Sequence, residues 1–267
     1  MRSLLQNSLI GKKSSIKHFH NMNEKKQYKH QRNYFNKEFL SIAQYRLSEW
    51  QITYIDRIKK HLLDKDFRKK TLLDIATGRG YVAIEMAKLG MQVIACDLSF
   101  QSIKNLGKYK KQFSLKNLQL LNCPAEKIPL PDKSVDFIVA NAILEHIPNE
   151  KEAIAEWKRI LRPHGRMFIA VPLKLRYVWP FLWPINYIHD KRIGHLRRYN
   201  LQNLQEKFNL RVLKVFYTGH LLKVVSAITS LFIIKSERFS EFFEKIDTRQ
   251  ENKRYGASNI IVLFENK

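Results

Sequence analysis

The sequence contains little cysteine and no long apolar run. Its 267 residues include only two cysteines, Cys96 and Cys123, and each lies in or beside an apolar stretch, where a free thiol behaves as a small hydrophobic side chain. This pattern argues against a disulfide framework and favours a reducing compartment. The longest apolar run, Val224 to Ile234, is far shorter than the roughly 20 residues that span a bilayer. The sequence therefore predicts no transmembrane segment.

Acidic residues are also scarce, with 24 Asp and Glu against 48 Lys and Arg, so the net charge is +24. The excess is uneven, because residues 1–70 carry +11, residues 71–172 carry +4 and residues 173–267 carry +9. A basic excess of this size predicts an anionic partner. Hydrophobic residues make up 45% of the chain, which is enough apolar surface to exclude wholesale disorder.

The first 23 residues contain four basic residues, four serines and no acid. Three interpretations fit this composition: a mitochondrial presequence, a basic tail, or an extension upstream of a chain that starts at Met22. We assign residues 1–32 to a basic, disordered extension. Apolar residues from Phe39 to Leu62 recur with the spacing of one or two amphipathic helices, so residues 33–69 are expected to form a helical cap.

Strand and helix patterns alternate regularly from residue 71 to residue 172. Short apolar runs predict strands at 71–76, 91–97, 118–123, 135–141 and 166–172, and amphipathic runs predict helices at 80–90, 99–113 and 150–162. Ser99 is a suitable cap for the second helix. This alternation is typical of an α/β protein with a parallel sheet covered on both faces, in which ligands bind beyond the carboxyl ends of the strands.

The regular pattern ends after Pro172. Residues 173–200 hold two prolines and six aromatic residues, and this composition predicts an ordered loop or lid. A short helix is expected at 201–210, a strand at 211–219, an apolar helix at 221–234 and a final strand at 257–266. We therefore divide the chain into the extension, the cap, a core of residues 70–172, and a lid with the rest of the sheet at 173–267.

The segment from Leu72 to Gly80 reads LLDIATGRG, a strand followed by a Gly-x-Gly turn that opens a helix. Glycines let the backbone approach a ligand closely, but they do not distinguish a dinucleotide from another adenosine ligand. Asp74 distinguishes these two ligands, because a carboxylate repels the pyrophosphate of a dinucleotide and favours the sulfonium and ammonium groups of S-adenosylmethionine. Asp97 ends the second strand, where an acidic side chain can accept both ribose hydroxyls.

These residues resemble the class I S-adenosylmethionine-dependent methyltransferases, specifically the type 11 group. Four blocks carry the resemblance in order: LLDIATGRG, VIACDLS, AEKIPLPDKSVDFIVANAILEHIPN and LRPHGRMFIAVP. The resemblance implies a Rossmann-like, doubly wound, mainly parallel seven-stranded sheet whose last strand is antiparallel, with S-adenosyl-L-methionine as the cofactor. It also implies that the cofactor contacts a set of nine residues: Asp74, Ala76, Gly78, Gly80, Asp97, Leu98, Ala125, Glu126 and Asn141.

Within that set, the resemblance implies that Asp74 and the two glycines line the methionine half. Asp97 holds the ribose, Ala125 and Glu126 lie along the adenine, and Asn141 lies beside the sulfonium. The sequence departs from the family pattern at two positions. Ala76 replaces the usual first glycine, and Pro124 stands where the family has an adenine-contacting Asp, so altered adenine contacts are expected.

His146 is the first candidate catalytic base and His195 the second, because a neutral imidazole can take a proton from a substrate hydroxyl. The segment ending at His146 resembles the E-x-x-E-H element of quinone and small-RNA-end methyltransferases, in which two Glu and a His hold a divalent metal. Ala142 replaces the first Glu, so we predict no metal. The alternative for His146 is local capping or packing.

Gly194 to Tyr199 reads GHLRRY and resembles a segment that follows strand five in type 11 enzymes. Its Arg197, Arg198 and Tyr199 are candidate substrate-binding residues, since clustered Arg and Tyr can orient an anionic or hydroxylated substrate. The alternative is a solvated basic loop.

A dense aromatic patch at 179–184 lies among basic residues. It suits either contact with an anionic membrane, together with the apolar helix, or a lid over the substrate.

The sequence thus predicts a methyltransferase that acts on a small-molecule or lipid-linked acceptor by O- or C-methylation. Two alternatives remain open: an RNA methyltransferase, and a non-catalytic cofactor-binding accessory protein. Nucleic acid is the less favoured partner, because no separate RNA-binding module is evident. The basic flanks instead predict an anionic partner near the substrate entrance, such as a membrane surface or a phosphorylated lipid. We expect a cytoplasmic protein, with peripheral membrane contact and mitochondrial targeting as alternatives.

Overall fold

The computed structural model describes residues 26–40, 45–221 and 237–267. The presequence interpretation, the alternative start at Met22 and almost all of the expected apolar helix at 221–234 lie outside these residues. Within them, no helix combines the length and apolar character that crossing a membrane requires.

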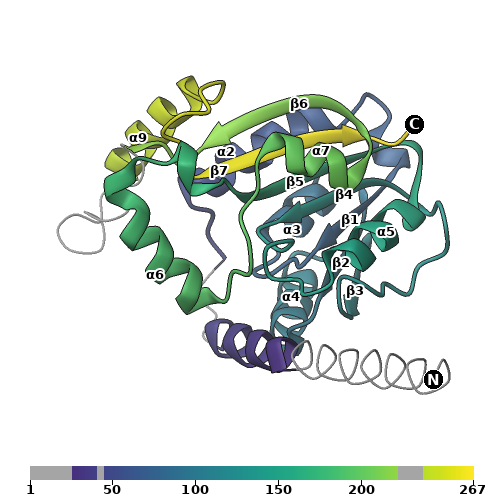
Figure 1. Cartoon of the computed structure of the whole chain (residues 1–267). Helices are drawn as coiled ribbons and strands as arrows, with labels where there is room; N and C mark the ends of the chain where they lie inside the picture. The colour runs from purple at the N-terminus through teal and green to yellow at the C-terminus, as the bar shows by residue number, and fades with distance from the viewer. Residues whose placement is uncertain (1–25, 41–44, 222–236) are drawn as a thin grey trace, which may run out of the picture.

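A seven-stranded sheet forms the centre of the molecule, in the order β3-β2-β1-β4-β5-β7-β6 (Figure 1). The strands are β1 (Thr71–Ile75), β2 (Gln92–Asp97), β3 (Leu118–Asn122), β4 (Val135–Asn141), β5 (Leu161–Pro172), β6 (Arg211–Thr218) and β7 (Asn259–Glu265). Strands β1 to β5 run parallel to one another, and β7 runs antiparallel to both β5 and β6. The predicted Rossmann-like α/β fold with an antiparallel last strand is confirmed.

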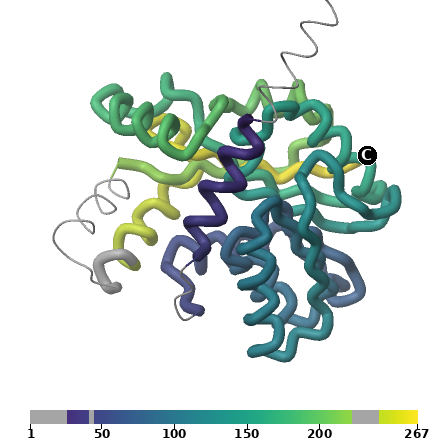
Figure 2. Tube along the Cα trace, turned by 90° about the horizontal axis from the view of Figure 1, so that it is seen from below, coloured from purple at the N-terminus to yellow at the C-terminus, as the bar shows by residue number. Residues whose placement is uncertain are grey.

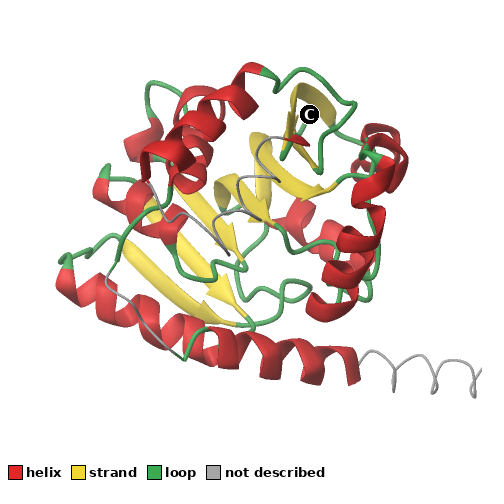
Figure 3. Cartoon of the chain, turned by 90° about the vertical axis from the view of Figure 1, so that its left-hand side faces the viewer, coloured by secondary structure: helices red, strands yellow, loops and turns green. Residues whose placement is uncertain are grey.

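Helices cover both faces of this sheet because its strands are apolar on both faces. In β1, Leu72 packs into one core cluster, whereas Leu73 and Ile75 pack into the other. The first face is covered by α2 (Glu49–Arg57), the π-helical turn η1 (Ile58–Leu62), α3 (Tyr81–Lys88) and α4 (Phe100–Gln112). The second is covered by α5 (Glu150–Ile160) and α7 (Leu201–Phe208). Figure 3 shows these layers from the side.

Side-chain caps fix where several of these helices begin. Ser99 Oγ accepts the backbone N–H of Ser102 at 3.2 Å, so the predicted cap of α4 is confirmed. Asn200 caps α7 in the same way, through the N–H of Asn203 at 3.0 Å. Such caps satisfy N–H groups that have no partner within the helix.

The helix over residues 26–38 is the first correction to the sequence analysis. Residues 26–32 were expected to be irregular but form the first half of this helix. Its contacts come from residues remote in sequence: Gln31 Nε2 donates to the His146 carbonyl at 2.5 Å, and the Phe35 and His146 rings lie 5.6 Å apart. Figure 2 shows the helix in purple, crossing the carboxyl edge of the sheet.

The expected loop at 173–200 is the second correction. It contains two short 3-10 turns, η3 (Leu175–Tyr177) and η4 (Pro180–Leu182), followed by the eleven-residue helix α6 (Trp183–Ile193). Pro184 lies in the first turn of α6, where a missing N–H breaks no helical hydrogen bond. A further helix that the sequence analysis did not predict, α9 (Glu237–Arg249), precedes β7.

Candidate functional site

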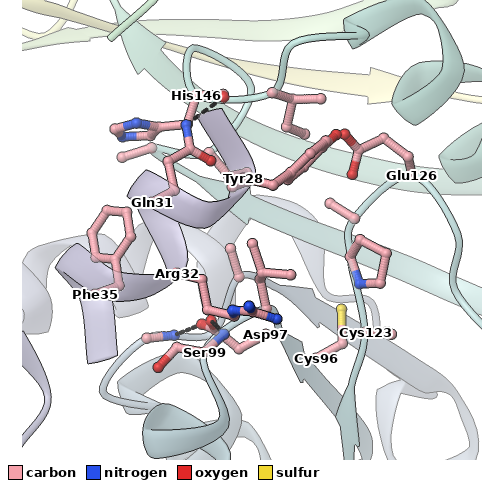
Figure 4. Close-up of a pocket in the computed structure, with 18 of the residues that line it drawn as sticks. Tyr28, Gln31, Arg32, Phe35, Cys96, Asp97, Ser99, Cys123, Glu126 and His146 are labelled. Atoms are coloured by element: carbon pink, nitrogen blue, oxygen red, sulfur yellow. Dashed lines mark hydrogen bonds between the residues drawn. The ribbon is translucent and has the colours of Figure 1, made fainter. Parts of the chain in front are cut away.

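A cavity opens at the carboxyl edge of β1, β2 and β4, beneath helix 26–38 (Figure 4). The helix contributes one wall, and the strand ends and the loops that follow them contribute the rest. The lining residues are Tyr28, Gln31, Arg32, Phe35, Phe39, Ala76, Gly78, Cys96, Asp97, Leu98, Ser99, Cys123, Pro124, Ala125, Glu126, Ala142, Ile143, His146 and Ile147.

The Gly-x-Gly turn forms the floor of this cavity and depends on left-handed backbone. Ala76, Gly78 and Gly80 have φ of 54°, 56° and 75°, and Gly80 is the N-cap of α3. A Cβ at Gly80 would lie 2.4 Å from Leu106 Cδ1, a distance at which atoms overlap. The helix-opening glycine is therefore required both by its conformation and by the packing of α4 against the turn.

Asp97 places a carboxylate at the centre of the cavity. Its Oδ2 accepts the Gly78 N–H at 2.8 Å and its Oδ1 accepts the Ser99 N–H at 2.8 Å. These bonds tie the end of β2 to the glycine turn, and they leave lone pairs on both oxygens for a ligand. Burial raises the pKa of Asp97, and the two N–H donors oppose that shift.

Six of the nine predicted cofactor residues line this cavity: Ala76, Gly78, Asp97, Leu98, Ala125 and Glu126. Asp74, Gly80 and Asn141 do not. Asp74 is buried behind the turn and accepts the Thr77 hydroxyl at 2.6 Å. Burial raises the pKa of Asp74 to about 7. In the structure Asp74 supports the turn through Thr77, and its direct contact with the cofactor stays a prediction.

Asn141 lies at the end of β4 and lines a second cavity instead. Its Nδ2 donates to the Tyr81 hydroxyl at 2.5 Å. The second cavity is lined by residues of α2, the strand ends and β7: Trp50, Tyr54, Arg57, Asn141, Ala142, Ala170, Val171, Thr218, Asn259 and Ile261. Ala142 lines both cavities. The first cavity is thus followed directly by a second, aromatic one at the same sheet edge.

The two candidate bases lie beside each other, with ring centroids 4.7 Å apart, but only His146 lines the first cavity. Burial, aided by His195, lowers the pKa of His146 to about 3. Its imidazole is therefore neutral at physiological pH and only weakly basic. His195 Nδ1 lies 2.7 Å from Asp190 Oδ1, and its side chain is 9% exposed. His195 lines neither cavity, and its action on a substrate stays a prediction.

The predicted substrate residues Arg197, Arg198 and Tyr199 also line neither cavity. Arg197 donates to the carbonyls of Ile147 and Pro148 at 2.9 and 3.0 Å. These bonds tie the loop that follows α6 to the segment between β4 and α5. The alternative of a freely solvated loop is not what the structure shows for Arg197, and the contact between Arg197 and substrate stays a prediction.

Arg198 ties the same loop back to α6, whereas Tyr199 bonds to the segment between β4 and α5. Arg198 forms two bonds to the Asp190 carboxylate, at 2.6 and 2.9 Å, and Tyr199 is 1% exposed with its hydroxyl 2.7 Å from Glu150 Oε2. Charge-assisted bonds of this kind fix loop geometry. The GHLRRY segment is therefore a clamp within the fold.

Among the lining residues that sequence reasoning missed, four come from helix 26–38 and one directly follows it: Tyr28, Gln31, Arg32 and Phe35, then Phe39. Figure 4 shows Gln31, Arg32 and Phe35 on the helix above the Asp97 loop. The signal in the sequence was the four-residue spacing of Gln31, Phe35 and Phe39. On a helix this spacing places side chains on one face.

Fold and cavity together define a Rossmann-like domain with a nucleoside-binding edge. Residues 73–169 match the family model described as a methyltransferase domain. A tRNA 5-carboxymethoxyuridine methyltransferase of Escherichia coli is 32% identical over 113 residues, which cover 42% of each chain. A demethylmenaquinone methyltransferase of Chlorobaculum tepidum is 30% identical over 125 residues, 46% of this chain and 49% of that protein.

A solved structure of geranyl diphosphate C-methyltransferase from Streptomyces coelicolor shares this fold, with a TM-score of 0.66 at 13% identity over 90% of this chain and 98% of that one. The chain spans about half the length of the curated relatives it matches. Residues 73–169 therefore match the methyltransferase-domain family, and over this region the chain is similar to class I S-adenosylmethionine-dependent methyltransferases of the type 11 group.

The donor set of the first cavity fits the cofactor of this family, S-adenosylmethionine. Asp97 offers oxygen acceptors for vicinal hydroxyls, and Leu98, Ala125 and Ile143 provide apolar surface for a flat ring. Pro124 offers no side-chain acceptor. We therefore keep the expectation of altered adenine contacts, with Glu126 or backbone groups in place of the family's Asp.

Proposed function

We propose that this protein transfers a methyl group from S-adenosylmethionine to a small-molecule or lipid-linked acceptor, by O- or C-methylation. The observation that carries the proposal is the succession of two cavities at the end of β4. One contains the Asp97 carboxylate, the other contains Trp50 and Tyr54, and Ala142 lines both. A donor site and an acceptor site must adjoin in this way for direct transfer.

Bound S-adenosylmethionine supplies an activated methyl group, and its transfer is an in-line displacement at carbon. The chain must align the acceptor and exclude water. Tyr54 is 5% exposed, and its ring packs edge-on to those of Tyr81 and Phe168, with centroids 6.1 and 5.4 Å away. A side chain fixed from two sides provides a rigid wall against which an acceptor is oriented.

The comparisons favour the small-molecule class. Two similar proteins act, by their names, on demethylmenaquinone and on geranyl diphosphate. The aromatic wall formed by Trp50 and Tyr54 suits an acceptor with an apolar body.

We assign no strong general base to this site. The weakly basic His146 lines the first cavity, which we call the donor cavity because it would hold the methyl donor. The second cavity, here called the acceptor cavity, has no histidine among its lining residues. The rate enhancement then comes mainly from alignment, which requires an acceptor that loses its proton readily, such as a phenol, an enol or a carboxylic acid.

We also propose peripheral contact with an anionic membrane through η4 and α6. Phe181, Ile185 and Ile188 are 60%, 50% and 67% exposed, and Lys191 and Arg192 follow in the last turn of α6. Apolar side chains flanked by cations suit the boundary between acyl chains and acidic headgroups. Sedimentation with phosphatidylserine vesicles tests the contact. Wild-type protein should co-sediment, Phe181→Ser with Ile188→Ser should not, and equal binding by both would contradict it.

The methyl-transfer proposal is tested by incubating the protein with methyl-labelled S-adenosylmethionine and three fractions of a cell extract: lipids, polar metabolites and RNA. We expect label in the lipid or metabolite fraction, and none with the Asp97→Ala variant. An Asp132→Ala variant serves as the control, because its carboxylate is exposed and remote in the fold. Label in no fraction would count against the proposal.

Transfer to RNA is the second candidate, favoured by the tRNA methyltransferase among the relatives and by the net charge of +24. Label that is confined to the RNA fraction and is lost on ribonuclease treatment would replace the small-molecule proposal with this one. Binding to RNA should then fall steeply with salt, because each neutralised phosphate releases counterions.

A further inference from the structure

Three side chains that could bind a metal ion converge behind the donor cavity. Glu145 and His146 follow β4, and His195 follows α6. One ligand atom from each lies within 4.8 Å of the others. The exposed fractions of Glu145 and His146 are 1% and 3%, so the cluster is buried.

Two of these side chains carry buried polar atoms that have no hydrogen-bond partner among the described residues. They are Glu145 Oε2 and His146 Nδ1. Most buried polar atoms in folded proteins are paired, so two unpaired atoms in adjacent residues point to an absent ligand. A cation suits both atoms, because each offers a lone pair.

His195 is oriented as metal-binding histidines are. Its Nδ1 lies 2.7 Å from Asp190 Oδ1, so Nδ1 carries the proton, and its Nε2 is directed toward Glu145 Oε1, 3.6 Å away. Arg198 holds the Asp190 carboxylate in place with bonds of 2.6 and 2.9 Å. A carboxylate on the outer nitrogen of a histidine fixes its tautomer and leaves the inner nitrogen free to bind a metal.

We propose that Glu145, His146 and His195 bind one divalent transition-metal ion. Two imidazoles with one carboxylate suit zinc, cobalt(II) or iron(II) better than magnesium or calcium, which prefer oxygen ligands. In a tetrahedral site with bonds of about 2.0–2.2 Å the ligand atoms lie about 3.3–3.6 Å apart, so the widest pair must close by more than about 1 Å when the ion binds. His146 also lines the donor cavity, which gives the ion a path to the cluster.

The proposal differs from the sequence prediction of no metal, which rested on Ala142 in place of a second Glu. Bonds from Arg197 and Tyr199 fasten a segment remote in sequence against the segment that holds Glu145, and His195 comes from that remote segment.

The test measures metal directly and needs no methyl acceptor. Untagged full-length protein is treated with EDTA, dialysed against zinc chloride, and analysed for bound metal by mass spectrometry. Cobalt(II) titration gives a second readout, because its visible absorption reports nitrogen and oxygen ligands. Glu145→Gln and His195→Gln remove one ligand each. His189→Gln is the matched control, since its ring lies 6.0 Å from His195 but outside the cluster.

We expect one zinc per chain in the wild type and in His189→Gln, and at least a 100-fold weaker affinity in the two ligand variants. Asp190→Asn should weaken binding roughly 10- to 100-fold, as changes in outer-shell partners do. Circular dichroism verifies that each variant is folded. If a ligand variant does not fold, the cobalt spectrum of the wild type decides, with d–d absorption supporting the site. Less than a tenth of an equivalent in the wild type, or unchanged binding in both folded ligand variants, would overturn the proposal.

Discussion

Replacing Gly80 by Ala tests whether the glycine turn and α4 are built against each other. Gly80 has φ of 75°, and left-handed backbone costs an alanine about 1–2 kcal/mol. The new Cβ would also lie 2.4 Å from Leu106 Cδ1, and Leu106 is 1% exposed, so it cannot swing into solvent. Overpacking a core site costs about 1–3 kcal/mol. We therefore expect Gly80→Ala to lower the free energy of unfolding by about 2–5 kcal/mol.

Combining this change with Leu106→Ala separates the two causes. Removing the Leu106 side chain costs about 2–5 kcal/mol by itself, but it also abolishes the clash. In the double variant only the backbone strain at position 80 remains, so the two effects should fall short of additivity by about 1–3 kcal/mol. Gly107→Ala in α4 is the control, because its Cβ meets Leu120 at an ordinary 3.7 Å, and it should be neutral or stabilising.

The assay is equilibrium urea unfolding followed by circular dichroism, with titration of S-adenosylhomocysteine on the folded variants. Cofactor affinity should fall in Gly80→Ala and recover partly in the double variant, because relief of the clash lets the turn return. Additivity within about 0.5 kcal/mol would refute the packing argument. So would unchanged stability of Gly80→Ala.

Three further outcomes follow from the site. Burial raises the pKa of Asp74 to about 7 from an ordinary value of about 3.9, so the folded state binds this proton more tightly and the contribution of Asp74 to stability falls as pH rises from 4 to 7. A shift of about 3 pH units corresponds to about 4 kcal/mol, so Asp74→Asn, which retains an acceptor for Thr77, should gain up to about that much stability relative to wild type between pH 4 and 7; parallel pH profiles would contradict this. Tyr199→Phe should lower stability by about 1–3 kcal/mol through the lost bond to Glu150 and leave cofactor affinity unchanged, and unchanged stability would contradict the structural role of this bond. Phe35→Ala should weaken binding of S-adenosylhomocysteine about fivefold by calorimetry, and no change would exclude helix 26–38 from the site.

The sheet could be predicted from sequence because its signals are local. Each strand is a short apolar run between turn residues, and the glycine turn and Asp97 lie at strand ends, where topology alone brings them to one edge. Helix 26–38 could not be predicted in full, because lysines and asparagines interrupt its few apolar residues and leave no clear amphipathic pattern. Its apolar face is completed only by contact with His146 and Phe39.

Side-chain roles were harder to predict than the fold. The basic side chain of Arg197 indicated an anionic ligand, but its partners in the structure are two backbone carbonyls, which any sequence supplies, and the carboxylate of Glu150 at 3.4 Å. Helix α6 was missed because Pro180 and Pro184 suggested a loop. Pro180 precedes α6, and Pro184 occupies its first turn, where proline is tolerated. The pairing of Glu145 with His195 depends on a fold-wide clamp, so no local pattern could reveal it.

The central claim is that the cavity beneath helix 26–38 binds S-adenosylmethionine through Asp97. Calorimetric titration with S-adenosylhomocysteine tests it most directly, using wild type, Asp97→Ala and the exposed control Asp132→Ala. Two charge-assisted hydrogen bonds are together worth about 3 kcal/mol or more, so we predict one site per chain and at least a roughly 100-fold weaker affinity in Asp97→Ala alone. No binding to the wild type, or equal affinity in folded Asp97→Ala, would contradict the claim.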